Sequence, residues 1–212
     1  MWQIGCAENV LVCGSTRSGK TKFVENLLDS KDIWKCKMDK IIYCYGIHNS
    51  AVDRLSLKHP DITLIEGMVD LSQPRQLFSP SENNLFITDD NFLLTQNSRD
   101  FTNFITRGTS HCHCTCISIE HGLFSEGKER RTQSHHWDQY ILFKNHRSLG
   151  QLGVLAKQLS IAVPTMQYAY EDAVMNRDYG YLIVDCRLDT PPELKLITNV
   201  LSENDNPPYV YL

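Results

Sequence analysis

Residues 14–21 (GSTRSGKT) combine the residue types that bind a nucleoside triphosphate. They fit the pattern G-x-x-x-x-G-K-[ST], whose glycines let the backbone turn tightly around phosphate oxygens. Successive backbone N–H groups and the start of a following helix attract negative charge. The lysine reaches the β- and γ-phosphates, and the next hydroxyl is a ligand of Mg²⁺. We predict that ATP and Mg²⁺ bind here through Gly14, Ser15, Thr16, Arg17, Ser18, Gly19, Lys20 and Thr21.

Two adjacent carboxylates, Asp89 and Asp90, end the apolar run at residues 84–90 (NLFITDD). One carboxylate at the end of such a strand can hold Mg²⁺, and a second can accept a proton from an attacking water molecule. We predict that Asp89 and Thr21 hold the metal and that Asp90 is the base. The sequence Asp-Asp-Asn is also typical of a turn or a helix cap. The phosphate-binding pattern upstream favours the catalytic interpretation.

Short apolar runs alternate with helical patterns along the chain, which predicts buried strands of a mostly parallel sheet. The last two runs are joined by RLDTPPE, which is too short for a crossover helix and predicts a C-terminal antiparallel edge hairpin. We predict an α/β fold with helices on both faces of the sheet. A single P-loop ATPase domain would cover residues 1–203, and residues 204–212 would form a flexible tail. The predicted strands are 9–13, 40–46, 62–67, 84–90, 114–119, 139–145, 180–186 and 194–201, and helical spacing occurs at 20–28, 149–159 and 168–175.

The composition is that of a globular protein whose overall charge does not attract nucleic acid. The chain of 212 residues is 42% hydrophobic and carries a formal charge of −4. A DNA partner would therefore need a local basic patch or an assembled ring. The sequence shows no secretory signal and no apolar stretch of about 18 residues. We expect an intracellular protein, neither secreted nor bound to a membrane, with reduced thiols at its eight cysteines.

Several longer stretches resemble one family of motors. They include LFITDDN at 85–91, FTNFITRGTSH at 101–111, ILFKNHR at 141–147 and YGYLIVD at 179–185. These stretches resemble the genome-packaging ATPases of Polintons (Mavericks), adintoviruses and related double-stranded DNA viruses, in the FtsK–HerA superfamily of P-loop motors. The resemblance covers nearly the whole chain and is weakest over residues 40–80. It implies a RecA-like core with an additional strand, assembled as a homo-oligomeric ring with active sites between neighbouring subunits.

The same resemblance implies a function and its partners. ATP hydrolysis would drive double-stranded DNA, the viral genome, through the ring into a preformed capsid. Capsid vertex proteins would then be partners. The protein would work in the nucleus or cytoplasm of a host cell, and association with the virion is a further expectation.

The sequence departs from the family pattern at several positions. Relatives carry Thr-Gln-Asn-Leu-Phe, whose Gln senses the γ-phosphate, where this chain has EHGLF at 120–124. His121 is therefore the predicted catalytic hydrogen-bond donor at that position. An asparagine that relatives carry before the Y-x-x-x-F strand is missing here, where its place falls near Trp137 and Asp138. The Asn-Pro-Arg of many relatives is replaced by Asn-His-Arg at 145–147. These departures leave two alternatives open: a nucleotide-binding scaffold with weak or no turnover, and a P-loop kinase of small molecules or nucleosides, although no compact arginine-rich lid is found.

A ring ATPase usually receives a positive charge at the γ-phosphate from the neighbouring subunit. Arg107 is the first candidate, because it ends the helix after the acid pair in a region that faces the next subunit in related motors. Arg130, Arg131 and Arg147 are alternatives, and a solvated surface residue is the simpler interpretation of each. Lys128, Arg130 and Arg131 also form a basic run, which would contact DNA phosphates or only increase solubility.

Residues 111–121 (HCHCTCISIEH) concentrate side chains that can bind zinc. Zinc sites usually pair ligands two to four residues apart in a turn, with a second pair well downstream. Here the residues alternate along a predicted strand, which places Cys112, Cys114 and Cys116 on one face. The family resemblance implies that this strand is central and buried, so we predict core positions for Cys114 and Cys116. His135-His136 downstream keep a metal site open.

Overall fold

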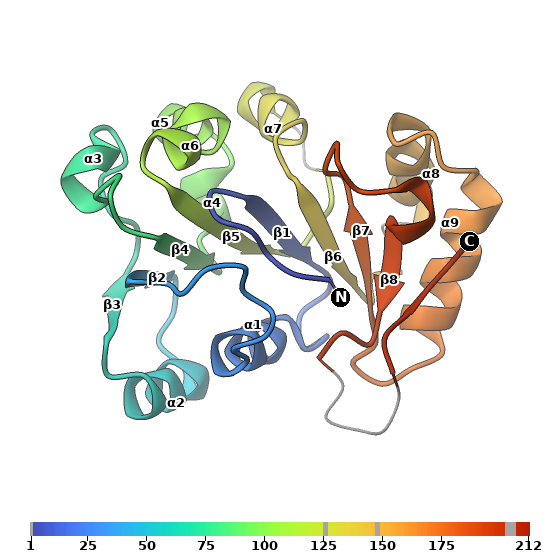
Figure 1. Ribbon diagram of the computed structural model, residues 1–212, viewed down its shortest axis with the longest axis horizontal. Coiled ribbons are helices and arrows are strands. Elements are labelled where there is room, and N and C mark those ends of the chain that lie inside the picture. The colour runs from blue at the N-terminus through green and yellow to red at the C-terminus, as the bar shows by residue number, and fades with distance from the viewer. Residues whose placement is uncertain (1, 125–126, 147–148, 202–206) are drawn as a thin grey trace.

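A computed structural model describes residues 2–124, 127–146, 149–201 and 207–212. This part of the chain forms a nine-stranded sheet with helices on both faces (Figure 1). The strands follow the apolar runs of the sequence. They are β1 (Asn9–Cys13), β2 (Lys40–Tyr45), β3 (Ile62–Glu66), β4 (Asn84–Asp89), β5 (Cys114–Glu120), β6 (Gln139–Phe143), β7 (Tyr181–Asp185), β8 (Leu196–Thr198) and β9 (Tyr209–Val210).

The strand order in the described residues is β3-β2-β4-β5-β1-β6-β7-β8-β9. Neighbouring strands from β3 to β6 are parallel, and those from β6 to β9 are antiparallel. β5 lies between β1 and β4. Because parallel strands end at one edge of a sheet, the phosphate-binding pattern after β1 and the acid pair of β4 meet at that edge.

The helices form two layers, and each layer has its own apolar core. On β1, Val10 and Val12 pack with Phe23 of α1, whereas Leu11 and Cys13 pack on the opposite face with α5, α8 and α9. This alternation is the two-residue period of a strand buried on both faces.

None of the described helices is long and apolar enough to cross a membrane. The helices are α1 (Lys20–Asp29), α2 (Ser50–Lys58), α3 (Pro74–Leu77), α4 (Phe92–Thr95), α5 (Arg99–Asn103), the π-helix η1 (Phe104–Gly108), α6 (Thr109–His111), α7 (Lys128–Gln133), α8 (Leu149–Gln158), α9 (Val163–Tyr170), the π-helix η2 (Glu171–Met175) and the 3₁₀ helix η3 (Pro192–Leu194).

The predicted α/β class, the mostly parallel sheet, the two helical layers and the antiparallel C-terminal pair are confirmed. The flexible tail predicted at 204–212 is wrong for its last part, because Tyr209–Val210 form β9 beside β8. The hydroxyls of Tyr209 and Tyr211 donate to Asp172 Oδ2 at 3.0 and 2.6 Å, which fixes this strand against η2. Residues 204–206 lie outside the described residues, and the extent of the single domain stays a prediction.

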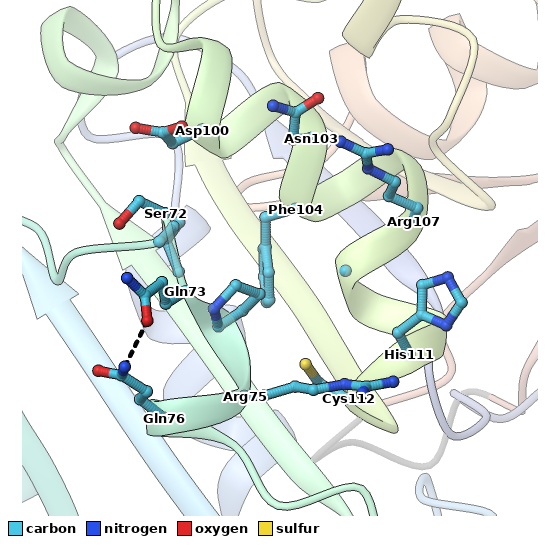
Figure 2. Close-up of a pocket in the computed structure, with 13 residues that line it drawn as sticks. Ser72, Gln73, Arg75, Gln76, Asp100, Asn103, Phe104, Arg107, His111 and Cys112 are labelled. Carbon is cyan, nitrogen blue, oxygen red and sulfur yellow. Dashed lines mark hydrogen bonds between the residues drawn. The ribbon is translucent and has the colours of Figure 1, made fainter.

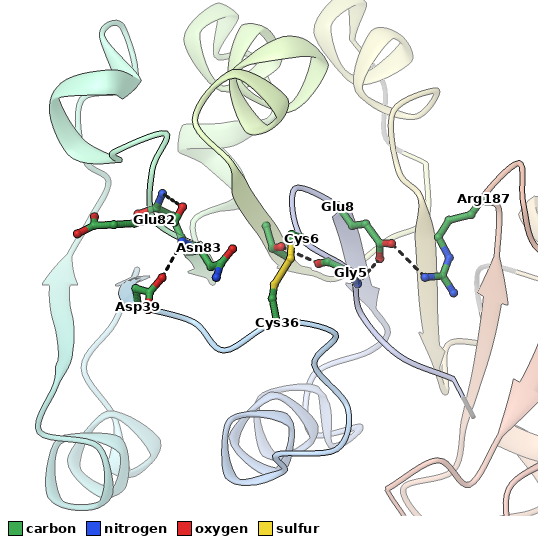
Figure 3. The surroundings of a disulfide bond; sticks show 10 residues. Gly5, Cys6, Glu8, Cys36, Asp39, Glu82, Asn83 and Arg187 are labelled. Atoms are coloured by element: carbon green, nitrogen blue, oxygen red, sulfur yellow. Dashed lines mark hydrogen bonds and ion pairs between the residues drawn. A yellow bond between two sulfur atoms is a disulfide. The ribbon is translucent and has the colours of Figure 1, made fainter.

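Cys6 and Cys36 form a disulfide bond, with Cα atoms 6.4 Å apart (Figure 3). This corrects the prediction that all eight cysteines are thiols. The bond joins the segment before β1 to the connection between α1 and β2. Glu8 accepts a hydrogen bond from the Gly5 amide at 2.9 Å and pairs with Arg187 at 3.0 Å, so the same segment is also attached to the end of β7 (Figure 3). The long separation of the two cysteines left no local signal in the sequence.

Replacing Cys36 by Ser is expected to lower the free energy of unfolding by about 2–4 kcal/mol under oxidising conditions, because the closed loop restricts the unfolded chain. The measurement is urea unfolding of the parent and Cys36→Ser, with and without a reductant. Reduction should abolish the difference, and Cys186→Ser, which removes a free thiol, is the control. Equal unfolding of the parent and Cys36→Ser without reductant would show that the bond does not form in solution.

Candidate functional site

The phosphate-binding loop, residues 14–21, begins at the carboxyl edge of the sheet. Its first amide, Gly14 N, donates to the carbonyl of Glu120 at the end of β5, at 3.2 Å. A side chain at Gly14 would not fit, since its Cβ would lie 2.5 Å from Cβ of Phe143. Gly19 precedes α1 with a φ of 103°, a conformation that favours glycine. Both glycines of the pattern are therefore required by the backbone of the loop.

The ammonium group of Lys20 lies across this loop. Its Nζ donates to the carbonyls of Gly14 and Ser15, each at 2.9 Å, and the residue is only 8% exposed. Burial lowers the pKa of Lys20, while the carboxylate of Asp89 is the strongest influence that raises it. The loop thus holds a positive charge at the position where the pattern predicts the phosphates.

Ser18 Oγ is buried and has no hydrogen-bond partner within the described part of the chain. Buried polar atoms are normally paired, and an unpaired one calls for a partner such as a ligand. A phosphate oxygen is a suitable acceptor beside a buried ammonium group and a run of backbone N–H groups. The residues of the loop therefore fit a triphosphate.

Asp89 closes the other side of the site, at the end of β4. Its Oδ2 accepts hydrogen bonds from Thr21 Oγ1 at 2.9 Å and from Tyr43 OH at 2.8 Å. Burial raises the pKa of Asp89, and the hydrogen bonds from Tyr43 and Thr21 oppose this effect. A carboxylate and a hydroxyl in contact are oxygen donors of the kind that Mg²⁺ prefers. Thr21 and Asp89 therefore fit the predicted metal.

Asp90 faces His121, with Oδ1 lying 3.3 Å from Nε2 of the imidazole. Its backbone has a φ of 57°, which a non-glycine residue adopts only where its surroundings impose it. Gly46 leaves room for this backbone, because a Cβ on Gly46 would lie 2.3 Å from the carbonyl oxygen of Asp90. Both side chains are 51% exposed, so water reaches them. The structure thus brings the predicted base and the predicted hydrogen-bond donor together.

Tyr43 and Gly46 were not predicted from the sequence. Both belong to the apolar run at 40–46. A tyrosine inside such a run and a glycine at its end are common in buried strands and do not by themselves indicate a site. Their roles arise from the parallel pairing of β2 with β4, in which Tyr45 lies opposite Asp89. Only this long-range register places a phenol and a glycine next to the acid pair.

Arg130 is not available to a neighbouring subunit or to DNA, which corrects both suggestions made for it. It is 5% exposed, and its Nη1 donates to Glu120 Oε1 at 2.8 Å and to Gln133 Oε1 at 2.9 Å. Its Nη2 contacts the second oxygen of Glu120. Glu120 ends β5 and precedes His121, so this buried ion pair fixes α7 to the strand end that carries the imidazole.

The other basic candidates are Lys128, Arg131 and Arg147. Lys128 and Arg131 are exposed on α7, so a contact with DNA stays a prediction for these two residues. Arg147 lies outside the described residues.

Arg107 does not meet the phosphate-binding loop of its own subunit. It is exposed in η1, where the nearby carbonyl of Ile105 accepts a hydrogen bond from Asn9 Nδ2 at 2.8 Å. Asn9 begins β1, whereas the loop follows the end of β1, so Arg107 lies towards the opposite edge of the sheet. Figure 2 shows Arg107 with Arg75 and His111 around a cavity of about 430 Å³. Its action on a neighbouring subunit stays a prediction.

The cysteines of the zinc-like cluster lie in the core. Cys112, Cys114 and Cys116 are fully buried in one apolar cluster, which confirms the core positions predicted for Cys114 and Cys116. Burial is the main reason that the pKa of each of these thiols is raised. Among the described residues, no group of three or more His, Cys, Asp or Glu side chains could hold a metal ion.

No protein-family model matches the sequence, and the search of curated proteins found no match. Among solved structures, the fold is similar to that of the genome packaging NTPase B204 from Sulfolobus turreted icosahedral virus 2, solved in complex with ATP-gammaS. That match has a TM-score of 0.53 and 14% identity, and it covers 86% of this chain and 94% of the other. A match to ATPases 2 and 3 of EssC from Geobacillus thermodenitrificans has a TM-score of 0.47 and 13% identity, and it covers 74% of this chain and 34% of that one. At this level of identity the likeness shows the fold alone: the described part of this chain folds like that genome packaging NTPase.

Proposed function

We propose that this protein is a Mg²⁺-dependent ATPase that moves double-stranded DNA into a preformed capsid. The contact of Thr21 Oγ1 with Asp89 Oδ2 at 2.9 Å carries the ATPase proposal, because it joins the phosphate-binding loop to the acid pair. Translocation of DNA into a capsid is supported by the resemblance of the sequence to packaging ATPases. It is also supported by the similarity of the fold to a viral genome packaging NTPase.

Each residue of the site has a distinct task in this proposal. The amides of the loop and Lys20 bind the phosphates and orient the γ-phosphoryl group. Thr21 and Asp89 hold Mg²⁺, which neutralises charge that develops on the phosphate oxygens. Asp90 accepts a proton from the attacking water molecule, and His121 donates a hydrogen bond that orients that water or the γ-phosphate.

The proposed assembly is a homo-oligomeric ring around DNA, with Arg107 supplied to the γ-phosphate of a neighbouring subunit. The position of Arg107 away from its own phosphate-binding loop is compatible with action on another subunit. Capsid vertex proteins would hold the ring at the capsid. The proposed place of action is the nucleus or cytoplasm of a host cell.

The test is release of phosphate from ATP with and without double-stranded DNA, in the parent and in Lys20→Ala. We expect hydrolysis by the parent, faster turnover with DNA, and no DNA-dependent activity in the variant. ATP binding without turnover in either condition would support the scaffold alternative and contradict the motor. Hydrolysis that DNA does not change would leave an ATPase and remove translocation from the proposal.

Mixing of two inactive variants tests the trans role of Arg107. Arg107→Ala and Asp90→Ala subunits should be inactive alone and regain part of the activity together, because a mixed ring contains some interfaces with both groups intact. The control is Arg99→Ala, which removes an exposed arginine outside the candidate set and should keep its activity alone. No recovery of phosphate release with Arg107→Ala would contradict its action across an interface.

A further inference from the structure

A cavity of about 580 Å³ lies directly beside the phosphate-binding loop. Its lining includes Gly19 at the start of α1, and an aromatic cluster of Phe23, Phe143 and Tyr181. The ring centroid of Phe23 lies 5.6 Å from that of Phe143 and 4.7 Å from that of Tyr181. This largely aromatic cavity lies next to the phosphate-binding loop. It is therefore suited to a flat group attached to the phosphates that the loop would bind.

Tyr179 forms the part of this cavity that touches the loop. Its Cδ1 lies 3.1 Å from the position that a Cβ on Gly19 would occupy, so the ring rests against the loop backbone. The residue is nevertheless 73% exposed. A large ring that stays exposed while it contacts a phosphate-binding loop is suited to stacking with a ligand rather than to core packing.

The segment that presents Tyr179 is held in place on both sides. The φ of Tyr179 is 55°, and the next residue, Gly180, packs so closely on η2 that a Cβ would lie 2.2 Å from the carbonyl oxygen of Ala173. On the other side, the guanidinium of Arg177 lies 5.3 Å from the ring centroid of Tyr209 in β9. The backbone that carries Tyr179 is therefore constrained before any ligand binds, which limits the entropy lost on binding.

Charged groups around the cavity do not disfavour a neutral ring. Arg54 lines the cavity, and its Nη2 lies 2.6 Å from Glu25 Oε1. The positive charge of Arg54 is therefore balanced by a carboxylate. Lys22 also lines the cavity, and its Nζ lies 3.7 Å from Oε2 of the same Glu25, so one carboxylate faces two cationic groups. The cavity thus combines an apolar interior with a cationic border.

We propose that Tyr179 is the base-stacking residue of the nucleotide site, and that this cavity receives the purine and ribose of the nucleotide whose triphosphate the loop binds. The inference rests on the proposed function, because it requires that the loop binds a nucleoside triphosphate. A purine presents a larger stacking surface than a pyrimidine, so Tyr179 also gives the site a preference for ATP over UTP.

Calorimetric titration with Mg-ATP, Mg-UTP and Mg-tripolyphosphate tests this role, because tripolyphosphate has no base. Tyr179→Ala is expected to weaken ATP binding by at least about fivefold and to leave tripolyphosphate binding within about twofold of the parent. The preference for ATP over UTP should shrink in the same variant. Tyr179→Trp should bind ATP as well as the parent, and Tyr168→Ala, which removes an exposed tyrosine outside the cavity, should change nothing.

The three ligands separate failure of this inference from failure of the proposed function. Equal binding of ATP and tripolyphosphate by the parent would overturn the base site while the phosphate site stands. A loss of tripolyphosphate binding in Tyr179→Ala equal to its loss of ATP binding would show that Tyr179 acts only through the loop. If the parent binds neither ligand, the proposed function fails and the base site fails with it.

Discussion

Lys20→Ala is expected to abolish measurable ATP turnover. The ammonium group is buried at the loop, and removal of one preorganised donor at developing charge typically lowers kcat by about 10²–10³-fold. Nucleotide affinity should fall as well, because Lys20 Nζ is the buried cation nearest to the loop carbonyls of Gly14 and Ser15. The measurement is steady-state phosphate release together with calorimetric titration of Mg-ATP.

The control for this prediction is Lys31→Ala, which removes an exposed lysine after α1 with the same change in charge. Thermal unfolding of both variants shows whether the fold is retained. Unchanged phosphate release by a folded Lys20→Ala protein would mean that the ammonium group does not act on the nucleotide, and the loop would lose its assignment.

Asp90→Asn is expected to bind ATP nearly as well as the parent and to hydrolyse it about 10²–10⁴-fold more slowly. The amide keeps the shape of the side chain and a hydrogen bond to His121, but it cannot accept a proton from water. Asp90 is half exposed, and the hydrogen bond of Thr21 goes to Asp89, so replacing Asp90 should leave the metal side of the site intact. Single-turnover hydrolysis and equilibrium binding measure the two effects separately.

Asp89→Asn, compared with Asp90→Asn, tests which of the two acids holds the metal and which is the base. Asp89 contacts Thr21 and Tyr43, so its replacement should weaken the binding of Mg-ATP and make turnover depend on a higher Mg²⁺ concentration. An exposed acid away from the site, Asp61, provides the matched Asp→Asn control. If Asp89→Asn and Asp90→Asn had the same profile for binding and turnover, the division of tasks between them would be wrong.

The parts of the site that the sequence predicted are those that local spacing determines. A glycine-rich loop between a strand and a helix needs only consecutive residues, and Asp89 and Asp90 follow directly from one apolar run. The sequence also assigned Thr21 and Asp89 to one metal, and the structure places them in contact where parallel strands end at one edge.

The parts that the sequence did not predict depend on pairings between distant segments. Tyr43 reaches Asp89 only through the register of β2 against β4. Arg130 lies in a basic run typical of a surface, and its burial is compensated by the distant Glu120 together with Gln133. The strand β9 and the bond between Cys6 and Cys36 likewise join segments whose own residues carry no sign of the partner.

The end of β5 connects a surface helix to both sides of the proposed nucleotide site. The carbonyl of Glu120 accepts the first amide of the loop, its carboxylate holds Arg130 of α7, and the next residue, His121, faces Asp90. A push on α7 therefore has to shift this strand end or break a buried ion pair. Any partner that pulls on the exposed side of α7 would change the distance between the imidazole and the base, and so the rate of hydrolysis.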